Sequence, residues 1–479
     1  MTSLAAPDAT LYWLSRRTRN DQFLLYCFAE SAREDAELRA EILDRCAAIP
    51  ELRVRLYDDP TGLAYPMWTA AEPESAQILR HRLTGPCWPE LLAALGRLAG
   101  TGVDATKYPW LLHIFRGIRD SPVSDQRVTV VVLQISHALV DGRGASRIAR
   151  ALFTEPALST RGPLRAADEP ASRAGGPEPL AGGAALSAAT ARIARLGPGA
   201  RGTSLVRSLR AAALLPVGMA RTLRRGIGAA RARGELDALT AAGRVPPPGS
   251  GYPPGPLNGP VEVAGHAVRM LVCPADEFRV PGLSVTVVGL TAVSIAIERY
   301  LRDRGADVTR LGAQVPMALP PRPGVRNNYR SLGVDLGAGK CDPRRRAATI
   351  AAELAARRER ARHPLLDAQD AVDAVVPPLL LRRDVRDYPI HAVPEQITGH
   401  TVVSSVNRGP ADLTFGGAPV RFTGGFPALG AVMHLTHGIH GLGETVTLSL
   451  HADPAAVPDP DTYAGYLREA VREMSHAAG

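Results

Sequence analysis

The middle of this 479-residue chain changes abruptly in composition, and the change limits how the rest can fold. From 166 to 255 Ala, Gly, Pro and Arg predominate, and the stretch closes with PPPGSGYPPGP at 246–256. Such a sequence is typical of a connection between folded regions, because it offers few large apolar side chains to a core. We therefore expect an N-terminal region at 1–165, a linker at 166–255 and a C-terminal region at 256–479.

The N-terminal region mixes helical and strand patterns. Apolar residues at helical spacing predict helices at 35–48, 88–98 and 145–153. The β-branched run RVTVVVLQIS at 127–136 is the clearest strand in the chain. A strand that runs through a short loop into a helix is typical of an α/β fold.

The C-terminal region carries the same mixture, which again indicates an α/β fold. We expect a strand followed by a buried helix within 283–300, strands at 400–406 and 445–451, and a helix at 461–474. Asp459 or Asp461 is available to cap that last helix.

The formal net charge of +9 is concentrated in one segment. Ten arginines and no acidic residue lie at 192–233, so the rest of the chain is close to neutral. The two outer regions therefore lack the basic surface expected of a nucleic-acid-binding protein. We expect no nucleic-acid partner.

Within the basic segment, two short amphipathic patterns at 205–228 are separated by Pro216. One face of the second pattern carries Met219, Leu223 and Ile227. The patterns predict a helical hairpin, for which three interpretations are open. Residues 203–233 rest on an anionic membrane, gather a phosphorylated substrate, or simply expose their arginines to water.

The five cysteines form no CxxC pair, which disfavours a disulfide framework and a thiolate metal site. No stretch has the pattern of a signal peptide or of a spanning helix, so we expect a cytoplasmic protein, at most peripheral at the inner membrane face. His434, His437 and His440 repeat at every third position. Gly438 and the flanking strand pattern favour a bend there over a metal site, and we expect no metal.

The strongest chemical signal is QISHALVDGRG at 134–144, between the clearest strand and a helix. It places His137, Asp141 and Gly142 in a loop at a strand end, where α/β proteins commonly carry catalytic groups. A neutral imidazole can take a proton from an attacking hydroxyl, amine or thiol. Asp141 is placed to fix the loop by pairing with an arginine, and Gly142 to let the backbone turn or approach another segment closely. A buried structural histidine and a helix-capping aspartate fit the spacing equally well.

This stretch resembles the HHxxxDG motif of acyltransferases with the chloramphenicol acetyltransferase-like fold. That superfamily includes nonribosomal peptide condensation domains and the wax ester synthase/diacylglycerol acyltransferase family. By this resemblance His137 is the catalytic histidine and Asp141 is structural, while Ser136 replaces the first histidine. The implied fold is α/β: two chloramphenicol acetyltransferase-like halves, each a mixed sheet with helices, and an active-site channel between them.

Further segments are similar to the wax ester synthase/diacylglycerol acyltransferase family in particular, and they follow the same order along the chain. They are PLNGP at 256–260, GLSVTVVGLTAVSIAIERYLRDRG at 282–305, VPMALPPRPGVRNNYRSLGVDL at 315–336, SSVNRGPADLTFGGAPV at 404–420 and HADPAAVPDP at 451–460. The second of them has Thr286 and Val287 where the family carries an Asn-Asp pair. Asn327 or Asn328 takes the asparagine position of the third segment, and Asn407 lies near the turn of the fourth.

The resemblance implies an acyltransferase in which His137 activates an acceptor hydroxyl, or less readily an amine, for attack on an acyl thioester. The thioester donor is acyl-CoA or an acyl-carrier protein, and no other cofactor is expected. No GxSxG elbow occurs, so we expect no covalent acyl-enzyme. Candidates for oxyanion or substrate contacts are Ser136, Asn327, Asn328, Ser404, Ser405 and Asn407.

Two alternatives stay open beside this interpretation. The first is a stand-alone condensation enzyme of natural-product biosynthesis that takes an acyl or peptidyl donor from a carrier protein. The second is a non-catalytic homologue that binds a hydrophobic ligand or a partner protein. The departures at Ser136, Thr286 and Val287 keep both alternatives open.

Overall fold

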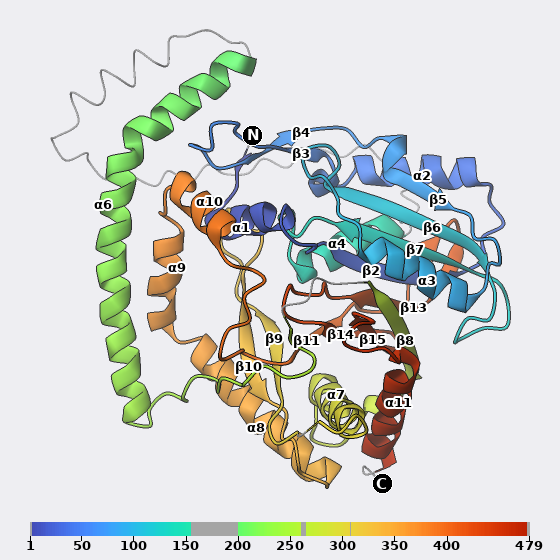
Figure 1. The fold of residues 1–479 in the computed structure, drawn as a ribbon. Helices are drawn as coiled ribbons and strands as arrows, with labels where there is room; N and C mark the ends of the chain where they lie inside the picture. Colours follow the sequence, from blue (N-terminus) through green and yellow to red (C-terminus); the bar gives the residue numbers. More distant parts are fainter. Residues whose placement is uncertain (1, 155–199, 260–264, 307, 477–479) are drawn as a thin grey trace, which may run out of the picture.

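The computed structural model describes residues 2–154, 200–259, 265–306 and 308–476. The N-terminal half is built on a six-stranded sheet with the order β12-β13-β2-β7-β6-β5 (Figure 1). Its strand β7 is buried along its whole length and pairs with antiparallel neighbours on both sides. The strands are β2 (Gln22–Ala29), β5 (Ile78–His81), β6 (Trp110–Ile118), β7 (Val128–Ile135), β12 (Thr414–Phe415) and β13 (Ala418–Phe426). A separate small sheet holds β1 (Thr2–Ser3), β3 (Val54–Tyr57) and β4 (Met67–Ala70).

Among the described residues, four α-helices belong to this half, and each carries buried apolar residues. They are α1 (Ala6–Ser15), α2 (Asp35–Ala47), α3 (Trp88–Ala99) and α4 (Gly142–Phe153). The helices predicted at 35–48, 88–98 and 145–153 and the strand predicted at 127–136 are confirmed within a few residues. Two short 3-10 turns lie between them, η1 (Pro50–Leu52) and η2 (Ser75–Gln77).

The C-terminal half is built on a second six-stranded sheet with the order β10-β9-β11-β14-β15-β8. Its strands are β8 (Ala267–Pro274), β9 (Gly312–Ala318), β10 (Tyr329–Asp335), β11 (Thr401–Asn407), β14 (Leu435–Leu442) and β15 (Thr445–Ala452). Its helices are α7 (Val285–Arg302), α8 (Pro343–Ala361), α9 (Asp367–Asp373), α10 (Pro378–Asp387) and α11 (Pro460–His476), with the 3-10 turns η3 (Ala275–Phe278) and η4 (Pro364–Leu366). The predicted strands at 400–406 and 445–451 and the predicted helix at 461–474 are confirmed.

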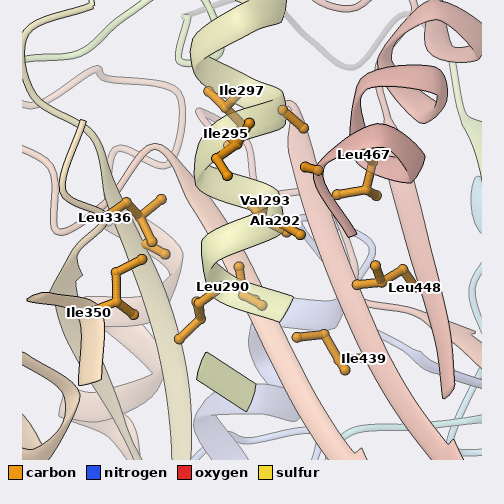
Figure 2. Close-up of a cluster of buried hydrophobic side chains, with 14 of the residues drawn as sticks. Leu290, Ala292, Val293, Ile295, Ile297, Leu336, Ile350, Ile439, Leu448 and Leu467 are labelled. Carbon is orange, nitrogen blue, oxygen red and sulfur yellow. The ribbon is translucent and has the colours of Figure 1, made fainter. Parts of the chain in front are cut away.

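Helix α7 forms the centre of the C-terminal core, and the strand predicted at its start does not form. Ser284 caps the helix, since its Oγ accepts from the backbone N–H of Val287 at 3.4 Å. The β-branched run that suggested a strand is therefore helical. Figure 2 shows α7 between Leu336 on one side and Leu467 of α11 on the other. Burial on nearly every face of this helix outweighs the strand propensity of Val and Ile.

Two strands from the C-terminal region join the sheet of the N-terminal half. β13 pairs antiparallel with β2, so that Phe426 lies opposite Phe23, and β12 pairs with β13. The region predicted at 256–479 thus contributes strands to both sheets. This exchange ties the two halves together beside β2, whose first residue, Gln22, lies opposite the last residue of β7, Ile135.

The predicted helical hairpin is wrong, because one long helix, α6 (Ala200–Ala241), spans both amphipathic patterns. Pro216 lies inside it; a proline removes one backbone N–H and favours a kink, but it need not reverse the chain. Figure 1 shows α6 in green at the left edge, beside α9. The first part of the predicted linker, 166–199, lies outside the described residues. None of the described helices, α6 included, combines the length and apolarity needed to cross a bilayer.

The predicted bend at the histidine repeat is also wrong. β14 begins directly after His434 and continues through His437 and His440, and Gly438 pairs with Ser404 of β11. His434 lies 3.1 Å from Asp453, and Nε2 of His437 lies 2.7 Å from a tyrosine hydroxyl. In the part of the chain that the structure describes, no group of three or more His, Cys, Asp or Glu is placed to hold a metal ion.

Candidate active site

The loop that carries His137 connects β7 to α4, and buried side chains hold it in place. Ala138, Leu139 and Val140 are at most 6% exposed and belong to the N-terminal core. His137 lies beside them and is partly exposed. Because three consecutive apolar side chains anchor the loop, the imidazole has a defined position relative to the sheet.

Asp141 holds this loop by capping α4, not by the predicted pairing with an arginine. Its Oδ1 accepts from the backbone N–H of Gly144 at 2.7 Å, and no ion pair to an arginine is formed by the described residues. Gly142 has room for a side chain, since a Cβ there meets only Oε1 of Gln22 at 3.8 Å. The close approach occurs instead at Gly144, where a Cβ would lie 2.8 Å from Cβ of Val140.

A side chain of the C-terminal half binds the imidazole. Asn327 lies in the loop between β9 and β10, and its Oδ1 lies 2.8 Å from Nδ1 of His137. The two residues are 190 positions apart in the sequence. The fold thus brings together two residues that the sequence predicted as parts of one site.

The orientation of the Asn327 amide determines which ring nitrogen of His137 carries the hydrogen. Nδ2 of Asn327 donates to the backbone oxygen of His137 at 2.6 Å and to Oδ1 of Asp8 at 3.0 Å. Both partners can only accept, so turning the amide round would place its oxygen against two other oxygens. Oδ1 of Asn327 therefore accepts from Nδ1–H of His137. Nε2 keeps its lone pair, which is the form that a general base needs.

Asp8, which the sequence analysis did not select, completes this arrangement. It lies in the first turn of α1 and is 1% exposed. Its two oxygens also accept from the backbone N–H groups of Asn327 at 2.9 Å and Arg326 at 3.0 Å. The guanidinium of Arg326 donates to the carbonyl of Leu139 at 3.1 Å. An acidic residue in a first helical turn usually indicates only a helix-dipole interaction, so the sequence carried little signal for this role.

Burial controls the charge of the two titratable groups. Desolvation lowers the pKa of His137 below 6.5, although the Asn327 bond and the charges of Asp141 and Asp8 act in the opposite direction. The imidazole is therefore neutral at pH 7. Desolvation also raises the pKa of Asp8 above 3.8, against the hydrogen bonds from Arg326 and Asn327.

Tyr329 is a second neighbour that the sequence did not indicate. Its ring centroid lies 5.9 Å from that of His137 at an interplanar angle of 42°, and the residue is 37% exposed. Burial of its hydroxyl raises the pKa of Tyr329 above 10. The ring therefore lies beside the imidazole as a neutral aromatic side chain.

Several predicted contact residues are bonded elsewhere. The amide of Asn328 donates to a carbonyl of its own loop. Oγ of Ser405 lies 2.9 Å from Oγ1 of Thr286 at the start of α7. Asn407 is exposed, and its Oδ1 accepts from the backbone N–H of Gly409 at 2.9 Å. None of these contacts places the three side chains beside His137.

The prediction that Asn327 contacts the oxyanion is also wrong. Both hydrogens of its Nδ2 are already used, so this amide has none to give to an oxyanion. Ser136 is 2% exposed and its backbone carbonyl accepts from Leu139 at 2.9 Å, which helps to close the loop. Ser404 is partly exposed on β11, and no hydrogen bond joins it to His137 in the described residues.

Two cavities are lined by residues of both halves. One, of about 410 Å³, is lined by both halves, and its lining includes Asp21 and Phe23 of the N-terminal half and His266 of the other. Asp21 directly precedes Gln22, whose Nε2 donates to the carbonyl of Val140 at 2.6 Å. The other cavity, of about 230 Å³, is lined by the buried Asp8 and the partly exposed Arg326, among others. His137 itself is not among the residues that line either of these two cavities.

Solved structures of two kinds share this architecture. The wax ester synthase/diacylglycerol acyltransferase from Marinobacter aquaeolei VT8 has a TM-score of 0.59 and 17% identity, over 100% of both chains. A variant of the starter condensation domain of rhizomide synthetase, solved in complex with C8-CoA, has a TM-score of 0.55 and 15% identity, over 100% of this chain and 94% of that one. At these identities the likeness shows the fold alone. It is the two-half chloramphenicol acetyltransferase-like fold that the sequence predicted.

The chain belongs to the wax ester synthase/diacylglycerol acyltransferase family. Residues 4–244 match the catalytic domain of that family, and residues 326–475 match its C-terminal domain. A protein of Mycobacterium tuberculosis that is provisionally named a diacylglycerol O-acyltransferase is 25% identical over 319 residues. The match covers 64% of this chain and 55% of that protein, so the chain spans about half the length of the curated relative.

Proposed function

We propose that this protein transfers an acyl group from acyl-CoA to an acceptor hydroxyl, with His137 as the general base. The observation that carries the proposal is the fixed, neutral imidazole at the junction of the two halves, whose Nε2 has no hydrogen-bond partner among the described residues. Family membership supports the reaction class. The names of the relatives suggest a long-chain alcohol or diacylglycerol as the acceptor.

In the proposed reaction, Nε2 of His137 takes the proton of the acceptor hydroxyl as its oxygen attacks the thioester carbonyl. A C–O bond forms and the carbonyl oxygen becomes an oxyanion, which needs hydrogen-bond donors. Ser404 and backbone N–H groups are the remaining candidates for that role. The intermediate then collapses with loss of the C–S bond, and the leaving thiolate takes the proton from the imidazolium. His137 returns to its neutral form without a covalent acyl-enzyme.

We favour a hydroxyl over an amine because of the proton balance. A hydroxyl gives one proton to His137, whereas an aliphatic amine is protonated at pH 7 and must first lose another. Acyl-CoA is the proposed donor because the condensation domain with the same fold was solved with C8-CoA. A carrier-protein donor is the alternative, in keeping with the serine at position 136.

Incubation of the purified chain with a panel of donors and acceptors tests this assignment. The panel combines acyl-CoA or acyl-carrier protein with a long-chain alcohol, diacylglycerol or a long-chain amine, and mass spectrometry identifies the product. We expect an ester from acyl-CoA and at least one of the hydroxyl acceptors. Product only from the carrier-bound donor would favour a condensation enzyme. Bound lipid without any product would favour a non-catalytic homologue.

We also propose that α6 contacts an anionic membrane, which would bring the enzyme to lipid substrates at the cytoplasmic face. Its apolar residues Met219, Leu223 and Ile227 are 51%, 69% and 49% exposed, so the face they share turns away from the protein. Arg224 borders this face and Arg231 continues it, and both are exposed. Apolar side chains flanked by arginines suit a bilayer interface, where each cation near an anionic surface contributes about 1 kcal/mol.

Replacing Leu223 with aspartate is expected to weaken this contact by at least about 10-fold. The change removes an apolar insertion worth roughly 1.5–3 kcal/mol and adds a repelled charge. Flotation with phosphatidylglycerol vesicles measures the bound fraction, with phosphatidylcholine vesicles for comparison. Tyr388→Asp is the matched control, because Tyr388 is similarly exposed at 65% but lies outside α6. Equal flotation of the Leu223 variant and the wild type would rule out the contact.

A further inference from the structure

The carboxylate of Asp8 faces hydrogen-bond donors only. The backbone N–H groups of Arg326 and Asn327 and Nδ2 of Asn327 all point at it, at 3.0, 2.9 and 3.0 Å. An ionised carboxylate can accept from all three at once. An asparagine at this position has one acceptor oxygen, so its own amide hydrogens would face at least one of those N–H groups.

The position of Asp8 is set independently of the His137 loop. Helix α1 packs into the N-terminal core through Tyr12 and Trp13, which are 2% and 5% exposed. The ring of Trp13 stacks on Tyr65 with a centroid separation of 6.0 Å. Asp8 therefore projects from a fixed helix of one half and holds the β9–β10 loop of the other half.

Burying a carboxylate is costly, and Asp8 forms no ion pair with the described residues, although the charge of Arg326 offsets part of the cost. A neutral side chain would fill the space at lower cost. A carboxylate does one thing here that a neutral group cannot. It accepts from the backbone N–H and Nδ2 of Asn327 while also accepting from the backbone N–H of Arg326. It thereby keeps Oδ1 of the Asn327 amide directed at the imidazole.

We propose that Asp8 is a positioning residue for the acyl transfer. By fixing the Asn327 amide, it keeps the hydrogen of His137 on Nδ1 and the lone pair on Nε2. This inference rests on the proposed function for its effect on catalysis. Asp8 contacts no reacting atom and acts through Asn327.

The variant Asp8→Asn tests the proposal with two independent readouts. We expect kcat to fall by at least about 10-fold, as when an orienting partner of a catalytic histidine is replaced. The KM values for acyl-CoA and alcohol should stay within about 2-fold, because neither substrate has to bind Asp8. In ¹⁵N-histidine-labelled protein, the NMR signals of His137 should show a single Nδ1–H tautomer in the wild type and a mixture in the variant. The signals are assigned by their absence in His137→Ala.

Two comparisons separate positioning from general stability. Asp58→Asn is the matched control, since Asp58 also binds α1, through the hydroxyl of Tyr12 at 3.2 Å and through Arg16 at 3.1 Å, but does not contact Asn327. It should leave kcat and the His137 tautomer unchanged. In an Asn327→Leu background, Asp8→Asn should cause no further loss of kcat, because Asp8 can no longer affect the imidazole through the Asn327 amide.

Asp8→Ser is measured in parallel, in case Asp8→Asn does not fold at the assay temperature. The serine of Asp8→Ser is smaller than asparagine and still has one acceptor oxygen. We expect the same mixture of His137 tautomers in this variant. Wild-type kcat together with an unchanged His137 tautomer in a folded variant would overturn the proposal. If the wild type transfers no acyl group, the proposed function fails, while the NMR signals still decide whether Asp8 sets the tautomer.

Discussion

Replacing His137 with alanine is expected to lower kcat/KM for acyl transfer by about 10² to 10⁴-fold, the usual contribution of a general base. The imidazole is partly exposed, and both halves fix its position, through the apolar anchors of its loop and through Asn327. A steady-state assay of thiol release from acyl-CoA measures the loss. His476→Ala, which removes an exposed histidine at the end of α11, should retain full activity.

The pH dependence of the wild type provides an internal check on the same residue. Burial lowers the pKa of His137 below 6.5, so the base is lost only when the imidazole becomes protonated at lower pH. Activity should therefore persist as the pH falls through 6.5, and decline below it. An activity that required a protonated group at neutral pH would contradict a neutral His137.

Replacing Glu298 with alanine is expected to cost about 3–5 kcal/mol of folding free energy, the typical effect of breaking a buried ion pair. Glu298 on α7 lies 2.6 Å from a guanidinium nitrogen of Arg346 on α8, and their side chains are only 4% and 5% exposed. Without the carboxylate, Arg346 keeps bonds to Ser294 and to the carbonyl of Lys340 but loses its buried counter-charge. Thermal unfolding should shift downward by on the order of 10 °C.

The exposed pair of Arg279 and Glu444 is the matched control for this prediction. Its side chains are 61% and 81% exposed, so Glu444→Ala should change stability by no more than about 1 kcal/mol. Similar melting temperatures for the Glu298 and Glu444 variants would show that the buried pair does not stabilise the packing of α7 on α8.

Much of the fold could be predicted from local patterns in the sequence. The run of Val and Ile in β7 and the loop into α4 gave a strand, a helix and His137 in the correct order. Local pattern was insufficient to predict the secondary structure where residue types common in strands occur in a helix. The β-branched start of α7 is helical because the core covers it on nearly all sides, and Pro216 kept α6 from being predicted as one helix.

The contacts across the two halves were the least predictable part of the site. The resemblance offered Asn327 or Asn328 as a contact residue of the site, and only the hydrogen bonds of Asn327 to the His137 ring, to Asp8 and to the backbone oxygen of His137 distinguish the two. No local pattern in the sequence indicated the contacts of Asp8, because its partner Asn327 lies 319 positions away. The pairing of β13 with β2 was missed for the same reason, since it joins distant segments.

The most direct test of acyl transfer at His137 is to quantify thiol and ester in the same reaction, with and without the alcohol. For the wild type, free thiol and ester should appear in a one-to-one ratio, and both should depend on the alcohol. Intact-protein mass spectrometry should find no acyl adduct when the donor alone is present. Both products should fall together in His137→Ala. Equal ester formation by the wild type and His137→Ala would contradict the assignment of His137 as the base.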